Sequence, residues 1–242
     1  MGRKFEVRKA SMAKSGLAKS RLYSRFGKEI YMSAKQGGSN PDANRALKHL
    51  VEKAKKAQVP NDVIKRNIQK AEKGTGEDFT PIRYEGFGPG GTGIIVDTLT
   101  DNVNRTVSEV RNAFTKVGSK MGVSGSVEHG YNHLSYITVS GMDEETALEI
   151  LLMADLDILD ISEEDGNVEI EANGYDLDKI TEALQDADES IVIEDSENGW
   201  YPLDHIELDE DQQSLFDKFM ELINDCEDVQ EVYHNAKTVE EE

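Results

Sequence analysis

A glycine-rich turn, followed by a run of β-branched residues, divides this chain into two parts of different character. The turn spans residues 85–91, and the apolar run after it, residues 93–99, is typical of a buried strand. Before the turn, hydrophobic residues recur at helical spacing; after it, strand-like and helix-like segments alternate. The sequence therefore predicts an α+β protein whose N-terminal part is helical.

The glycines of this turn match the G-x-G-x-x-G pattern of dinucleotide-binding loops. Such a loop requires a helix that opens directly after the third glycine, so that its N-terminus faces a pyrophosphate. A strand-like run follows here instead, so we interpret the turn as a hairpin and expect no cofactor. Because the turn holds more glycine than a hairpin requires, we also hypothesise that a bulky partner approaches its backbone. The residues of this candidate loop are Gly86, Phe87, Gly88, Pro89, Gly90 and Gly91.

The net charge of −21 conceals a strong asymmetry along the chain. Residues 1–76 carry 19 Lys and Arg against 6 Asp and Glu, whereas residues 141–242 carry 3 against 35. A basic block on an acidic protein indicates an oriented encounter with a polyanion, since the first block attracts nucleic acid and the last repels it.

Three amphipathic helices are predicted in the basic block: residues 19–36, a second that begins at Asn40-Pro41-Asp42, and a third that begins at Pro60. In the first, a stripe of basic residues lies opposite the apolar side. Such a stripe is usually solvated surface, but one of a single sign also fits phosphate contact. The candidate nucleic-acid contacts are Arg3, Lys4, Arg8, Lys9, Lys14, Lys19, Arg21, Arg25, Lys28, Lys35, Lys55 and Lys56.

Beyond the turn, the pattern predicts a helix capped by Asn104 or Thr106, and then a short strand at 124–131. Residues 132–202 read as β-α-β-β-α-β, the ferredoxin-like order. A strand at 204–208, a helix at 209–225 with Leu215, Phe219 and Leu222 inward, and a strand at 229–233 would complete a second such domain. The predicted domains are 1–76, then 81–131 with 203–236, and an inserted 132–202.

No pattern in the sequence supports an active site. The lone Cys226 cannot anchor a structural zinc, and His129 and His133 have no ligand-spaced companions. No apolar run is long enough to span a bilayer, and a single cysteine suits a reducing compartment. We expect a cytoplasmic protein that is not an enzyme, binds no metal, enters no membrane and is a monomer.

Spaced blocks stand in one order at residues 84–91, 99–102, 104–106, 109–111 and 125–127. Together they resemble the YebC family, and its YeeN-like branch most closely. The resemblance runs from Gly2-Arg3-Lys4 to about Tyr233, nearly the whole chain. The resemblance implies the same three-domain layout. It also implies a regulator of transcription that binds DNA or, alternatively, a ribosome-associated factor that contacts rRNA and aids peptide-bond formation in proline-rich stretches. The sequence lacks a clear helix for reading base edges, which favours recognition of backbone or shape.

A third interpretation is a protein-interaction module that acts through the acidic C-terminal half. The sequence therefore predicts nucleic acid as the main partner, either DNA or rRNA, with the ribosome and a basic protein as alternatives.

Overall fold

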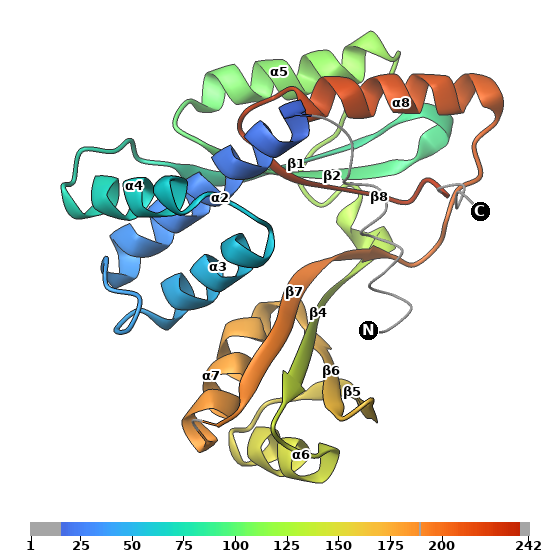
Figure 1. The fold of residues 1–242 in the computed structure, drawn as a ribbon. Helices are drawn as coiled ribbons and strands as arrows, with labels where there is room; N and C mark the ends of the chain where they lie inside the picture. The colour runs from blue at the N-terminus through green and yellow to red at the C-terminus, as the bar shows by residue number, and fades with distance from the viewer. Residues whose placement is uncertain (1–15, 189, 238–242) are drawn as a thin grey trace. The chain divides into compact units, whose positions relative to one another are not determined.

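The structure is a computed structural model that describes residues 16–188 and 190–237 (Figure 1). Its described part contains seven α-helices and two four-stranded antiparallel sheets. The chain forms two compact units: residues up to Val127 together with those from His205 onward, which we call unit 1, and Glu128–Asp204, which we call unit 2. The predicted α+β fold class is confirmed. The finer division into three domains stays a prediction.

Unit 1 begins with a three-helix bundle. Its helices are α2 (Gly16–Gly37), α3 (Arg45–Lys56) and α4 (Asn61–Glu72). Ile30, Leu47 and Ala54 are fully buried at its centre, as their helical spacing requires. The first helix ends where the sequence predicts, because Gly38 takes a φ of 95° that glycine adopts without strain.

The second helix does not begin at Asn40-Pro41-Asp42, and that prediction was wrong. Asn40 instead closes a turn, accepting a hydrogen bond from the Asp42 amide. The helix cap is Asn44, whose side chain accepts from the Leu47 amide and donates to the carbonyls of Ser33 and Gly38. Because these bonds attach Asn44 to the end of α2, the helix starts only after it.

The rest of unit 1 is a sheet covered on one face by two helices that lie side by side (Figure 1). The strands are β1 (Thr80–Phe87), β2 (Gly93–Thr100), β3 (Lys120–Met121) and β8 (Val229–His234), and the helices are α5 (Val103–Lys116) and α8 (Glu210–Asn224). We call this the split sheet; its strand order is β3-β1-β2-β8. Ile94, Val96, Phe114 and Phe219 form its buried core with the two helices.

The split sheet has the ferredoxin-like strand order, but one of its strands is a different segment of the chain from the one predicted. The predicted strand at 204–208 is absent, and only Ile206 forms a bridge, to Ala236. Its position is taken by β1, which pairs with β2 along eight residues of a local hairpin. A hairpin closes a short loop, so its pairing costs less chain entropy than recruiting a distant segment.

Two smaller predictions in unit 1 also fail, and a third is right only in part. The predicted strand 124–131 is a turn with a 3₁₀ segment, because the buried Glu85 carboxylate accepts from the Gly125 and Val127 amides, each at 2.7 Å. The cap of α5 is Asn102, not Asn104 or Thr106. On α8, Phe219 and Leu222 pack against the core as predicted, whereas Leu215 is exposed and its place is taken by the buried Phe216 and Ile223.

Unit 2 follows the predicted β-α-β-β-α-β order. Its elements are β4 (Tyr131–Ser140), α6 (Glu144–Met153), β5 (Ile158–Glu164), β6 (Asn167–Asn173), α7 (Leu177–Ala187) and β7 (Val192–Pro202). The strand order β5-β6-β4-β7 is that of the ferredoxin-like fold. The predicted hairpin at Asp165-Gly166 forms, with both residues at positive φ. Strand β7 is 11 residues long and pairs with β4.

Candidate nucleic-acid interface

The glycine-rich turn is a tight hairpin in which either a positive φ or close packing explains each glycine. Gly90 and Gly91 have φ values of 68° and 81°. A Cβ on Gly86 would lie 2.7 Å from the Phe114 ring and 2.8 Å from the Lys120 carbonyl oxygen, and one on Gly88 would lie 2.5 Å from the Ile94 side chain. The glycine content therefore no longer argues for a partner at this turn.

The role of residues 86–91 as a partner-approach loop stays a prediction. Pro89 is buried under the turn, whereas the Phe87 side chain is 49% exposed. Phe87 is thus the member of the loop best placed to touch another molecule.

The predicted contacts of the basic block fall into three groups. Arg3, Lys4, Arg8, Lys9 and Lys14 lie outside the described residues. Lys19, Lys55 and Lys56 are exposed on α2 and α3. The third group is the stripe of α2, comprising Arg21, Arg25, Lys28 and Lys35.

Within unit 1, the stripe of α2 pairs with carboxylates instead of lying open to solvent. Arg21 pairs with Asp225, Lys35 with Asp78, and the Arg25 guanidinium lies 3.5 Å from the Glu231 carboxylate. The Lys28 ammonium donates to the Asp228 carboxylate at 2.8 Å and to the carbonyls of Leu99 and Glu227. We call Arg21, Arg25 and Lys28 the paired stripe, since all three meet residues 225–231.

Asp228 is the centre of this contact. It is 1% exposed, and its carboxylate also accepts from Arg105, Thr100 and Thr106. Thr100 at the end of β2, and Arg105 and Thr106 at the start of α5, thus supply three donors, and α2 supplies one. Two of the blocks that resemble the family, residues 99–102 and 104–106, therefore help to anchor the bundle on the split sheet.

The hydrogen bonds around Asp228 control its ionisation. Burial favours the neutral acid, but the donors Lys28, Arg105 and Thr106 outweigh it and lower the pKa of Asp228 to about 2. The bonds from Arg105 to Asp228 and then Asp101 raise the pKa of the guanidinium. Asp228 is consequently a fixed charge at neutral pH, and its partner Lys28 is committed to it.

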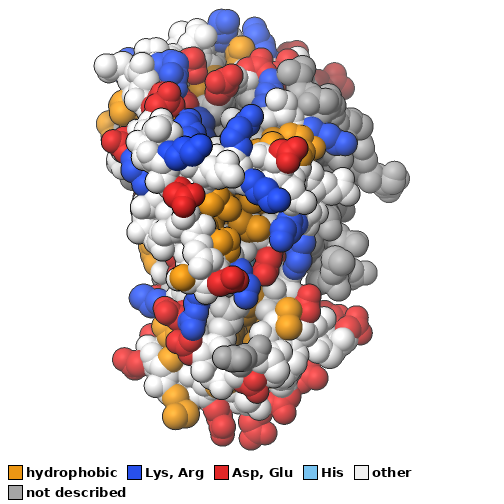
Figure 2. All heavy atoms as spheres, turned by 60° about the vertical axis from the view of Figure 1, so that its left-hand side comes forward, with side chains coloured by type: hydrophobic (Ala, Val, Ile, Leu, Met, Phe, Trp, Pro, Cys, Tyr) orange, Lys and Arg blue, Asp and Glu red, His pale blue; other side chains and the backbone are white. Residues whose placement is uncertain are grey.

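A second basic surface lies on α3 and α4. Its cations are exposed, and none forms an ion pair with another described residue: Lys48, Lys55, Lys65, Arg66 and Lys73. We call these the open cations. In Figure 2, Lys and Arg side chains are scattered among Asp, Glu and hydrophobic side chains on the side of the molecule that comes forward. Only Lys55 was among the predicted contacts. Helical spacing already placed the other four outside the core, and this is the signal that could have found them.

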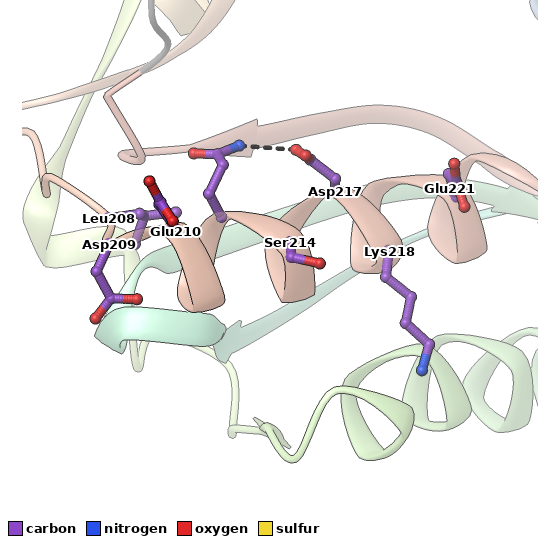
Figure 3. A pocket seen from close by; sticks show the side chains of 8 residues that line it. Leu208, Asp209, Glu210, Ser214, Asp217, Lys218 and Glu221 are labelled. Atoms are coloured by element: carbon purple, nitrogen blue, oxygen red, sulfur yellow. Dashed lines mark hydrogen bonds between the residues drawn. The ribbon is translucent and has the colours of Figure 1, made fainter.

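Two other kinds of site are relevant in the described part of the chain, a metal site and a groove. The described residues contain no group of three or more His, Cys, Asp or Glu side chains that could hold a metal ion. A shallow groove along α8 is lined by Leu208, Asp209, Glu210, Gln213, Ser214, Asp217, Lys218 and Glu221 (Figure 3). Four carboxylates against one ammonium make it unsuitable for a polyanion. None of the helices in the described part is long and apolar enough to cross a membrane.

Comparisons with known proteins agree over nearly the whole chain. Residues 3–74 match the family model of the TACO1/YebC protein N-terminal domain, and residues 79–236 match that of the TACO1/YebC second and third domain. Proteins named probable transcriptional regulatory protein are similar: one from Alteromonas mediterranea is 50% identical over 98% of this chain and 99% of its own, and one from Vibrio campbellii is 51% identical over 98% and 100%.

Among solved structures, a conserved hypothetical protein from Aquifex aeolicus is 33% identical, with a TM-score of 0.66 over 92% of this chain and 91% of its own. The order of helices, split sheet and inserted sheet is thus matched by sequence and by structure. This chain belongs to the TACO1/YebC family.

Proposed function

We propose that this protein is a non-enzymatic regulator of gene expression that binds nucleic acid through the open cations of α3 and α4. The observation that carries the proposal is the state of these side chains. They are exposed and unengaged by described acids, whereas the cations of the paired stripe are already neutralised. Exposed Lys and Arg bind phosphates and release condensed counterions, which supplies most of the affinity for a polyanion.

The charge of unit 2 supports an oriented encounter. Residues 128–204 carry 23 Asp and Glu against a single Lys. This unit repels nucleic acid, so attraction is confined to the basic bundle of unit 1.

The names of the relatives favour DNA as the partner, since those from Alteromonas mediterranea and Vibrio campbellii are named probable transcriptional regulatory proteins. Four of the five open cations are lysines, which contact phosphates as point charges on the backbone of either DNA or RNA. Contact with rRNA on the ribosome is therefore the second candidate function, and cytoplasmic action as a monomer fits both.

The charge of unit 2 also supports the third candidate, a module that docks a basic protein. Docking of a basic protein does not need the open cations. A salt titration of nucleic-acid binding therefore separates this candidate from the other two.

The test is a salt titration of binding to labelled duplex DNA and duplex RNA. The full chain is compared with a variant in which Lys48, Lys55, Lys65 and Lys73 are changed to Gln. If all four contact phosphates, the slope of log affinity against log salt should flatten by about 3 to 3.6 units. An unchanged slope would refute the proposal. Competition between either duplex and purified ribosomes then ranks the DNA and rRNA candidates.

A further inference from the structure

We infer that Arg21 and Arg25 form a second phosphate-binding site that the chain's own carboxylates occupy, so that Asp225 and Glu231 limit how tightly the protein binds nucleic acid. This inference rests on the proposed function and adds a regulation of it. The guanidinium groups lie one helical turn apart on the bundle that also carries the open cations.

The chemistry of the two guanidinium groups fits phosphate as well as it fits the present partners. A guanidinium donates N–H bonds to anionic oxygens, and carboxylate and phosphate present the same kind of acceptor. Arg21 donates to the Asp225 carboxylate, and Arg25 donates to that of Glu231. These two acids therefore hold the positions that phosphate oxygens would take.

The contact between α2 and residues 225–231 has a fixed centre, the pair Lys28–Asp228. Its exchangeable edge is the two pairs Arg21–Asp225 and Arg25–Glu231. Lys28 is 14% exposed and bonds to three oxygen atoms, and Asp228 beside it is buried. At the edge, the Asp225 side chain is 67% exposed and that of Glu231 is 51% exposed. Exposed ion pairs contribute little to stability, so the edge pairs can open while Asp228 keeps the bundle in place.

The exchange has a clear direction. An incoming phosphate strand brings several negative charges at once, whereas each edge acid offers one. The acids compete most effectively when phosphate is dilute or salt is high. Asp225 and Glu231 thus act as internal competitors. They raise the concentration of nucleic acid that is needed before Arg21 and Arg25 bind phosphate.

The experiment uses the full chain and a fluorescein-labelled RNA duplex, titrated over a range of salt. In the variant D225N/E231Q the two arginines lose their internal partners. Its slope of log affinity against log salt should steepen by about 1.4 to 1.8 units, because two further phosphates are neutralised. The control E210Q/E221Q removes the same charge from exposed positions of α8 and should leave the slope unchanged.

A combined variant, R21Q/R25Q/D225N/E231Q, should return the slope to that of the unchanged protein. Equal slopes in D225N/E231Q and in the α8 control would overturn the inference, and so would a steep slope that survives loss of the arginines. In both cases the proposed function stands, because the unchanged protein binds. Absence of salt-dependent binding in every protein would overturn the function and the inference together.

Discussion

Helices α2 and α3 carry basic faces that look alike in the sequence and behave differently in the structure. On α2 the cations of the paired stripe meet carboxylates about 200 positions later in the chain, as Arg21 does with Asp225 and Lys28 with Asp228. On α3, Lys48 and Lys55 are exposed and have no ion pair with a described residue. The difference shows that a run of like charges on a helix identifies a surface but does not tell whether its partner is external or internal.

The two faces also differ in what each charge contributes. A buried charge such as Asp228 cannot lose its partner without a large desolvation cost, whereas an exposed lysine is solvated either way. The face of α2 therefore combines structural and exchangeable pairs, and the face of α3 remains available for binding.

Among the variants that test the difference between the two faces, the largest loss of stability is expected at Asp228. Changing Asp228 to Asn leaves the Lys28 ammonium without its buried counter-charge and should lower the free energy of unfolding by about 3 to 5 kcal/mol. Urea denaturation followed by circular dichroism measures it. The matched control is E207Q, which removes a carboxylate from the exposed pair with Lys237 and should cost under about 1 kcal/mol. A loss at Asp228 no larger than that of the control would break the comparison.

The pH dependence of stability should show a smaller effect from the same residue. The pKa of Asp228 falls from 3.8 to about 2 on folding, so the ionised form favours the folded state. This contribution, about 2 kcal/mol, is complete above the unfolded pKa and is lost as the pH falls from about 4 to 2. The measurement is the difference in unfolding free energy between the unchanged protein and D228N across that range. A difference that stays constant down to pH 2 would contradict the assignment.

The smallest effect is expected at the edge of the paired stripe. Because the Arg25–Glu231 pair is partly exposed and its atoms are 3.5 Å apart, R25Q should change the free energy of unfolding by less than about 1 kcal/mol. Thermal unfolding of R25Q beside K55Q, which touches no described acid, provides the comparison. A loss at Arg25 as large as that at Asp228 would show that the edge is structural and not exchangeable.

Much of the fold could be predicted from local patterns. The helical spacing of Phe26 and Ile30 and the turn at Asp165-Gly166 each specify one element through nearby residues. The predictions failed where a residue far away in the sequence determines the local structure. Asn44 caps α3 because it also binds the end of α2, and residues 124–127 form a turn because the Glu85 carboxylate binds their amides.

The candidate site shows the same limit. Helical periodicity correctly placed Lys28 opposite the apolar side chains of α2, but nothing near it in the sequence indicates Asp228. Thr106 was predicted only as a candidate helix cap, and the acceptor that it shares with Thr100 and Arg105 became visible only when β8 came beside β2. Pairings between charges so far apart leave no periodic trace.

The most direct test of the account compares two charge-matched variants in the same salt titration with duplex RNA and duplex DNA. K48Q/K55Q removes two open cations, and R21Q/R25Q removes two cations of the paired stripe. The account predicts that the slope of log affinity against log salt flattens by about 1.4 to 1.8 units in the first variant and hardly changes in the second. A flattened slope in R21Q/R25Q, with K48Q/K55Q like the unchanged protein, would contradict it.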